Sequence, residues 1–424
     1  MPRLLLPLFL CFYIGVHAQQ DRYIYLKADR VFDGQNMHAG WGVLVQNNTI
    51  AAIGALKELP PNTTVYNLPG TTLMPGLIEG HSHLFLHPYN ETPWDDQVLK
   101  ESRAERTARA VNHARATLLA GFTTVRDLGT EGAMYDDAGL KQTIEKGVVP
   151  GPSMLIASRA IVAKGSYGPR WTNPDADLPQ GAAEVSGTEE MMREVRTQIS
   201  KGADVIKLYA DYRWGLNGAA APAFSLEEMQ VAVQTAAAGG RKTVAHASTP
   251  EGMRLAIEAG VSTIEHGDDG TPEIFKLMKA KNVALCPTLA AGDAVMQYRG
   301  WKKGTDPEPE RITQKKKSFQ QALQAGVTIC MGGDVGVFAH GDNAREMEMM
   351  VAYGMKPIDV LRSATSVNAR VFGVANVKGS LATGLPADII VVEGNPVDDI
   401  SNVRNIKLVM KAGVLYKTPL VDGK

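Results

Sequence analysis

Residues 73–84 read Leu73-Met74-Pro75-Gly76-Leu77-Ile78-Glu79-Gly80-His81-Ser82-His83-Leu84, an apolar run broken by proline and glycine that ends in two histidines. Residues i and i+2 of a strand point to the same face, so His81 and His83 would offer both imidazoles to one side of the chain. Neighbouring ligands of one metal site need this arrangement. Two histidines with this spacing also occur by chance, so the rest of the chain has to decide between a metal site and a coincidence.

Short β-rich runs alternate with amphipathic helical stretches from about residue 72 to residue 334. This alternation is typical of parallel strands joined by crossover helices. We predict strands over residues 72–83, 123–128, 153–158, 204–209, 243–246, 262–266, 284–287 and 328–334, and helices that include residues 106–120, 189–201, 226–238 and 313–325. Several helices end just before a glycine, which is a common C-cap. Eight strand–helix units predict an α/β protein with a TIM (β/α)8 barrel.

Both ends of the chain depart from this pattern. Residues 22–70 and 385–416 contain strand-like segments separated by turn clusters, and neither end is long enough to build a good core alone. We therefore predict one small β-sandwich domain built from both termini and packed beside the barrel. The predicted division of the chain is a signal peptide at residues 1–18, sandwich parts at 19–71 and 374–424, and the barrel at 72–373.

The first eighteen residues have the features of a secretory signal peptide. Arg3 supplies a positive start, residues 4–16 are apolar, and Val16-His17-Ala18 closes the stretch, so cleavage is predicted near Ala18. The apolar stretch is too short for a comfortable membrane span. We expect an exported protein, periplasmic or secreted, without a membrane anchor.

The composition excludes some partners. The chain has 44 basic and 45 acidic side chains and a formal net charge of −1, so nothing suggests nucleic acid as a partner. Only Cys286 and Cys330 follow the predicted signal peptide, and both lie in apolar, strand-like runs. Two buried thiols are therefore favoured over a disulfide framework, although a bridge between them stays open.

Metal-ligand residue types recur where the predicted strands end. The active site of a TIM barrel lies at the C-terminal ends of its strands. The polar residues at these ends are His81, His83, Lys207, His246, His266 and Asp334. One such residue is usually structural, but the whole set suits a borderline divalent ion such as zinc. If carbon dioxide converts the Lys207 amine to a carbamate, its two oxygens can bridge two cations, so a two-metal site is expected.

Several motifs together resemble those of the amidohydrolase superfamily of binuclear metal-dependent hydrolases. They are Pro75 to His83 in the first strand, Gly121-Phe122-Thr123-Thr124-Val125-Arg126-Asp127 in the second, Ile264-Glu265-His266-Gly267 in the sixth, and the C-terminal run from Gly379 to Ile390. The resemblance covers residues 22–416. It implies a barrel with an accessory β domain and hydrolysis without a covalent enzyme intermediate.

The resemblance also implies a role for each ligand. His81 and His83, with Asp334, would bind the more buried metal, and His246 with His266 the more exposed one. Lys207, as its carbamate, would bridge the two ions, which are zinc by preference. Asp334 would act as general base while a metal-bridging hydroxide attacks the scissile carbonyl.

Two loop segments resemble a narrower group. Residues 207–215 and 165–169 are similar to those of Xaa-Pro dipeptidases, carboxypeptidase-like enzymes and ochratoxin-hydrolysing amidohydrolases. The resemblance implies a small amide or peptide substrate with a free carboxylate. We expect Arg213 to bind that carboxylate and Tyr209 to bind substrate and stabilise the oxyanion, with packing as the alternative for both. His340 either contacts substrate or orders its loop.

The leading hypothesis is a metal-dependent amidase or peptidase that releases a C-terminal amino acid from dipeptides or N-acyl amino acids, ochratoxin A possibly included among them. Lactone or cyclic-amide hydrolysis of the imidazolonepropionase kind is the alternative on the same site. A catalytically inactive binding module would typically have lost ligands, and Lys207 argues against one-metal deamination. A homo-oligomer is the default. We expect His87 and His113 to be structural, and Lys315-Lys316-Lys317 to be a solvated helix face.

Overall fold

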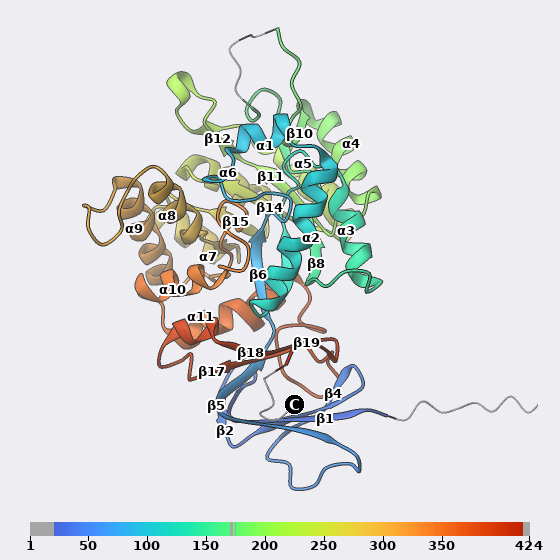
Figure 1. Cartoon of the computed structure of the whole chain (residues 1–424). Coiled ribbons are helices and arrows are strands. Elements are labelled where there is room, and N and C mark those ends of the chain that lie inside the picture. The colour runs from blue at the N-terminus through green and yellow to red at the C-terminus, as the bar shows by residue number, and fades with distance from the viewer. Residues whose placement is uncertain (1–20, 170–172, 174, 419–424) are drawn as a thin grey trace, which may run out of the picture.

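The computed structural model of the chain describes residues 21–169, 173 and 175–418. The predicted signal peptide lies outside the described residues. Figure 1 shows two regions, a strand-rich part that contains both ends of the described chain and a larger part in which helices surround parallel strands.

Strands from both termini form one mixed sheet. Its order is β19-β18-β17-β5-β1-β3-β4, and β2 pairs with β1. The strands are β1 (Tyr23–Phe32), β2 (Met37–Ala39), β3 (Gly42–Gln46), β4 (Thr49–Gly54), β5 (Thr64–Pro75), β17 (Ile389–Glu393), β18 (Ile406–Lys411) and β19 (Val414–Lys417). Side chains such as Leu26, Ile389 and Leu408 form its buried core. The termini therefore meet as predicted, but the pairing describes one continuous sheet, and the two facing sheets of a sandwich stay a prediction.

Parallel strands make up the centre of the larger part. One sheet contains β6 (Leu77–Ser82), β7 (Phe122–Asp127) and β8 (Ser153–Ile156). The other has the order β10 (Ala183–Val185), β9 (Ile161–Ala163), β11 (Val205–Tyr209), β14 (Lys242–Ala247), β15 (Thr263–His266) and β16 (Ala284–Cys286). All residues of β6, β7 and β11 are buried, as expected of strands covered on both faces.

Backbone hydrogen bonds connect these two sheets in a cyclic order. Asp204 N donates to Ile156 O at 2.8 Å, which joins the start of β11 to β8. On the other side, Cys330 N donates to Leu285 O at 2.8 Å and Val335 N donates to His81 O at 3.1 Å, so residues 328–335 run between β16 and β6. The larger part is thus a TIM-barrel-like α/β fold. The predicted eighth strand over residues 328–334 is not continuous, because only isolated bridges form there.

The predicted first strand, residues 72–83, is divided between the two regions. Its first residues end β5 in the terminal sheet, and β6 begins only at Leu77. Gly76 lies at the break, where a Cβ would be 2.1 Å from Thr123 Oγ1, so a larger residue does not fit. Gly76 N donates to Asp388 O at 2.9 Å, which ties the break to the C-terminal strands.

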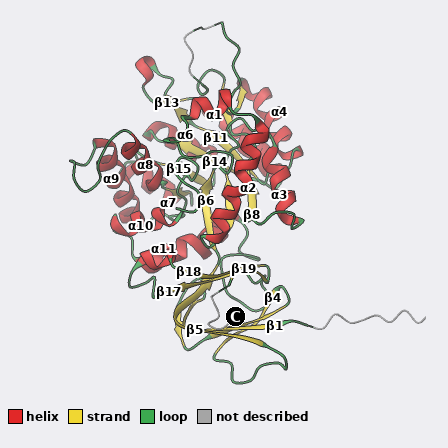
Figure 2. Cartoon of the chain, in the orientation of Figure 1, coloured by secondary structure: helices red, strands yellow, loops and turns green. Residues whose placement is uncertain are grey.

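Helices pack around the parallel strands (Figure 2). They are α1 (Trp94–Lys100), α2 (Arg103–Leu119), α3 (Asp136–Glu145), α4 (Gly187–Ser200), α5 (Leu226–Ala238), α6 (Pro250–Ala259), α7 (Pro272–Ala280), α8 (Leu289–Tyr298), α9 (Glu310–Ala325), α10 (Ala344–Ala352), α11 (Pro357–Arg362) and α12 (Asn368–Phe372). The predicted helices correspond to α2, α4, α5 and α9, and Gly260 and Gly326 end α6 and α9 in the left-handed conformation. No helix in the described part of the chain combines the length and apolar composition needed to span a bilayer. Cys286 and Cys330 are buried and free, so the bridge is not formed.

Candidate metal centre and active site

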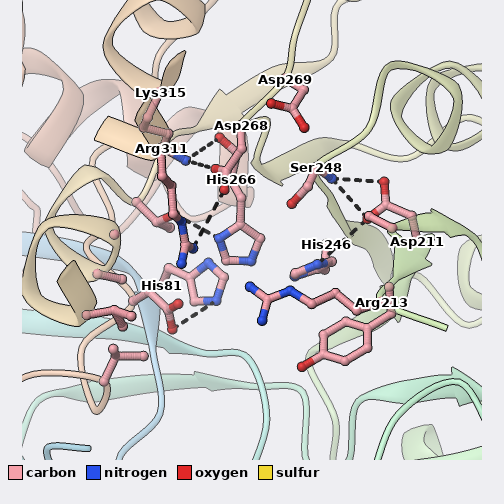
Figure 3. A pocket seen from close by; sticks show the side chains of 18 of the residues that line it. His81, Asp211, Arg213, His246, Ser248, His266, Asp268, Asp269, Arg311 and Lys315 are labelled. Carbon is pink, nitrogen blue, oxygen red and sulfur yellow. Dashed lines mark hydrogen bonds and ion pairs between the residues drawn. The ribbon is translucent and has the colours of Figure 1, made fainter. Parts of the chain in front are cut away.

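A cavity of ≈ 730 Å³ opens where the parallel strands end. Of the residues singled out in the sequence, those that line it are His81, His83, Tyr209, Arg213, His246, His266 and Asp334. Figure 3 shows the imidazoles of His81, His246 and His266 facing one another, although they come from three different strands. Five of the six predicted ligands therefore meet at one mouth, whereas Lys207 is buried in β11 and is not among the described lining residues.

His81, His83 and Asp334 form the first half of the cluster. The Nε2 atoms of the two histidines are 3.3 Å apart, as the spacing i, i+2 predicts. Asp334 Oδ1 lies 3.3 Å from His83 Nε2 and 3.6 Å from His81 Nε2. One potential ligand atom from each of His81, His266 and Asp334 falls within 4.8 Å of the others. This separation suits donors around a common cation.

His246 and His266 form the second half. Their ring centroids are 4.3 Å apart, and the ring of His266 is 5.1 Å from that of His81. Two ligand candidates, His266 and Asp334, have positive φ values of 76° and 62°. Such backbone costs roughly 1–3 kcal/mol per residue and is concentrated at functional sites. The strained turns aim both side chains into the cavity.

Lys207 is buried in β11, with 1% of its surface exposed, and its Nζ has no hydrogen-bond partner among the described residues. Burial lowers its pKa to about 8, which raises the fraction of neutral amine. An unpartnered buried amine of this kind needs an explanation. The neutral amine is the form that reacts with carbon dioxide, and a carbamate at this position would satisfy the site.

The electrostatics of the cluster fit a cation. Burial lowers the pKa of His81 to about 4 and that of His246 to about 3, and the charge of Lys207 adds to both effects, so these imidazoles are the neutral form that metals require. Burial raises the pKa of Asp334, but the neighbouring His81 and His83 hold it at about 2. Burial lowers the pKa of His83, yet its hydrogen bond with Asp334 raises it to about 9. A divalent ion between these two would replace that proton.

Comparison with known proteins identifies the family of this chain. The sequence model described as the amidohydrolase family matches residues 72–416. The chain belongs to the amidohydrolase family.

Ochratoxinase of Aspergillus niger is 28% identical over 415 residues, which cover 89% of this chain and 83% of that protein. Among solved structures, a Xaa-Pro dipeptidase with methionine bound in its active site is 30% identical and has a TM-score of 0.82 over 93% of this chain and all of that one. The structure of A. niger ochratoxinase superimposes with a TM-score of 0.79 at 26% identity and covers 95% of this chain and 97% of that one. These two relatives resemble the chain over nearly its whole length.

This amidohydrolase holds its imidazoles through their second nitrogens. His81 Nδ1 donates to Glu265 Oε2 at 3.0 Å, and Glu265 in turn accepts from Arg126 Nη2 at 2.7 Å. His83 Nδ1 donates to Gly129 O at 2.8 Å. These bonds leave the Nε2 atoms available for a metal and fix the ring planes. Glu265 and Arg126 stand inside the motifs quoted above, but sequence analysis gave them no role.

Glu79 is a second buried carboxylate that the sequence did not single out. It accepts hydrogen bonds from His81 N at 3.0 Å, Gly333 N at 2.9 Å and Asn343 Nδ2 at 2.9 Å. Burial raises its pKa to about 7. Because Gly333 precedes Asp334, Glu79 links the first histidine strand to the turn that carries the carboxylate.

Tyr209 lines the cavity, and its predicted roles in substrate binding and oxyanion stabilisation stay predictions. Its hydroxyl lies 3.4 Å from Glu131 Oε1, and its ring stacks on His246 with centroids 4.6 Å apart and planes at 9°. Tyr167 and Trp94 also donate to the Glu131 carboxylate. Glu131, which sequence analysis missed, therefore organises an aromatic wall beside the cluster of candidate ligands. Tyr209 belongs to that wall and orients His246.

Arg213 lines the cavity, whereas His340 is not among the described residues that line it. The Arg213 side chain extends into the cavity between His81 and His246 (Figure 3), as a substrate-binding cation should. His340 is absent from the residues described as lining the cavity. Its Nε2 donates to Leu86 O at 3.0 Å and its ring stacks on His113, so the loop-ordering alternative fits and the substrate contact does not.

Two further expectations concern structural residues. His87 lies between the carboxylates of Glu91 and Glu101, and His113 Nδ1 donates to Leu84 O at 2.8 Å, so both have the structural contacts expected of them. The expectation for the lysine run at 315–317 is wrong for its first member. Lys315 is only 6% exposed and faces the cavity, since helix α9 packs its inner side against the end of β15.

Proposed function

We propose that this amidohydrolase releases a C-terminal amino acid from dipeptides or N-acyl amino acids. The observation that carries the proposal is one cation, Arg213, in the same cavity as the ligand cluster. Its guanidinium has no ion-pair partner among the described residues and points toward the imidazoles (Figure 3). A guanidinium binds a carboxylate through two parallel hydrogen bonds. It would hold the free carboxylate of a substrate beside the metal centre.

We propose a binuclear centre with zinc, which suits neutral imidazoles and carboxylate oxygens. His81, His83 and Asp334 would hold one ion, and His246 and His266 the other. Lys207 would become a carbamate by adding its amine nitrogen to carbon dioxide with loss of a proton, and its two oxygens would bridge the ions. When bound, the ions would supply Lewis acidity to the scissile carbonyl and to the attacking water.

Asp334 would transfer a proton during hydrolysis. Asp334 would accept a proton from the attacking water through its carboxylate. As the carbon–nitrogen bond breaks, Asp334 would deliver that proton to the leaving amine. The water oxygen stays on the new carboxyl group, whose remaining proton is released to the solvent, and the enzyme is unchanged. Arg213 would orient the leaving amino acid.

The named relatives support the same reaction. One carries methionine, a free amino acid, in its active site. Another similar structure, 27% identical with a TM-score of 0.81, is a prolidase in complex with N-methylphosphonate-L-proline. The Aspergillus niger relatives are ochratoxinases. The methionine and the proline derivative named in two of these structures fit the substrate class proposed here.

The test is a release assay on metal-loaded protein. Dipeptides, N-acyl amino acids and ochratoxin A are offered as matched pairs of free acid and C-terminal amide, and the freed amino acid is detected. We expect release from the free acids and much less from the amides. Release from neither member of any pair would reject the proposal and leave lactones and cyclic amides, such as imidazolones, as the substrates to try on the same site.

The sequence also supports proposals about the location, the oligomeric state and the domain bounds of the protein. We propose export to the periplasm or the medium after cleavage near Ala18, a homo-oligomeric state, and a closed barrel over residues 72–373. The β domain would comprise residues 19–71 and 374–424. N-terminal sequencing of the mature protein and its mass in solution test the first two.

A further inference from the structure

Helix α9 reaches the metal cluster through one buried lysine. Lys315 Nζ donates to His266 O at 2.8 Å and also pairs with Asp268 Oδ1. One turn further along, Ser318 Oγ donates to Gly267 O at 2.6 Å. The carbonyl oxygens of His266, which ends β15, and of Gly267, which follows it, are thus both bound by side chains of α9. Figure 3 shows Lys315 above this turn, on the side opposite the imidazole of His266.

These bonds act on a strained residue. His266 has a φ of 76°, which non-glycine residues adopt only when the surroundings enforce it. Its imidazole is fixed from the other side by a 2.8 Å hydrogen bond between Nδ1 and Thr288 Oγ1. Because the carbonyl and the ring are held by different elements, the ring keeps one direction. Without Lys315 the His266 carbonyl loses its side-chain donor, and the peptide after His266 is held only through Gly267 N, which donates to Ala247 O at 2.9 Å.

Lys315 also restrains the carboxylate of Asp268, which lines the same cavity as His246 and His266. Asp268 lines the cavity, and its negative charge acts on His246. The other cation near it, Arg311, is 3.8 Å away, whereas Lys315 is in direct contact. Releasing this carboxylate would place a mobile anionic ligand beside the two histidines of the more exposed site.

We propose that Lys315 is a positioning residue for that site: with Ser318 it holds the turn of residues 266–268, so that His266 and His246 bind one of the two ions. The inference rests on the proposed metal-dependent function and deepens it. Under this inference, helix α9 controls the binding of the ion at His246 and His266, and it does not control the binding of the other ion. His81 and His83 are held by Glu265 and Gly129 instead, and Glu79 holds Gly333, the residue before Asp334.

The test compares Lys315→Met with Lys317→Met in the full-length protein. Lys317 is an exposed lysine two residues further along the same helix, so it is a matched control. Each protein is loaded with zinc or cobalt(II), dialysed against a graded series of chelator concentrations, and its metal content is measured. Loss of an outer partner typically weakens metal binding about 10- to 100-fold. We expect Lys315→Met to retain one ion where the wild type and Lys317→Met retain two, with a changed cobalt absorption spectrum.

The possible results distinguish a failure of the proposed function from a failure of the role of Lys315. A wild type that binds no divalent ion overturns the proposed function itself. A wild type and a Lys315→Met variant that both hold two ions with equal affinity overturn the role of Lys315 alone. Thermal unfolding identifies a variant that fails to fold, and in that case Ser318→Ala decides. It removes only the bond to Gly267 and should weaken the same ion a few-fold, and an unchanged affinity would overturn the inference.

Discussion

The floor and the rim of the cavity are built differently. At the floor, His81 and His83 are buried on or beside a strand and each is held by a second partner. At the rim, Arg213 and Asp269 are exposed loop residues without an ion-pair partner among the described residues. A preorganised floor suits chemistry that is common to many substrates, whereas an open rim with free charges suits selection among them.

Replacing Asp334 with Asn should have the largest effect, because it removes the base from the floor. General-base catalysis is worth about 10²–10⁴-fold, so we expect kcat to fall by that factor for every substrate. Steady-state rates on a dipeptide and on an N-acyl amino acid check this. Metal content measured on the same samples separates loss of the base from loss of an ion. Near-normal rates with full metal content would contradict the role assigned to Asp334.

Replacing Arg213 with Ala should affect the rim and leave the floor intact. Hydrogen bonds to charged groups are worth roughly 1.5–3 kcal/mol, which corresponds to about 10- to 100-fold in KM. The increase should appear for substrates with a free carboxylate and not for their C-terminal amides. Arg299→Ala is a matched control, since Arg299 is another exposed arginine on the cavity wall. Equal changes for acids and amides would show that Arg213 does not bind the carboxylate.

The floor was predictable because its signals are local. The spacing of His81 and His83 and the recurrence of ligand residues at strand ends are visible in the sequence, and the barrel rule brings those ends together. The same local reasoning placed helix α5 within its observed bounds. It failed at residues 72–83, where we interpreted an apolar run with Pro75 and Gly76 inside it as one strand, although the chain changes sheet at Gly76. The partners on both sides of that glycine are far away in the sequence.

The supports of the site were not predictable for the same reason. Lys315 lies 49 residues from His266, and three consecutive lysines usually indicate solvent. Glu131 follows no strand pattern, and only the fold surrounds it with Trp94, Tyr167 and Tyr209. Tyr209 itself was located correctly, but the direction of its hydroxyl depends on Glu131. Long-range hydrogen bonds, rather than residue types, decide what each of these side chains does.

The smallest effect should come from an exposed carboxylate of the rim, that of Asp269. Its backbone N donates to Ser248 O at 2.9 Å, and Ser248 N donates to the Asp211 carboxylate at 3.0 Å, two residues before Arg213. Both charges therefore stand on one hydrogen-bonded rim, with the carboxylate of Asp269 in the cavity (Figure 3). A dipeptide with a free ammonium group offers the matching opposite charges, and an N-acyl amino acid lacks one of them.

We expect Asp269→Asn to lower kcat/KM for unblocked dipeptides by up to about five-fold, because exposed ion pairs are worth about 0.2–1 kcal/mol. The same substitution should leave N-acetylated partners of those dipeptides unchanged. Glu227→Gln, which removes an exposed carboxylate outside the cavity, is the control. An equal decrease in kcat/KM for N-acetylated and unblocked dipeptides would mean that Asp269 affects the shape of the rim but does not bind the substrate's ammonium group. The cavity would then select its substrates through the carboxylate alone.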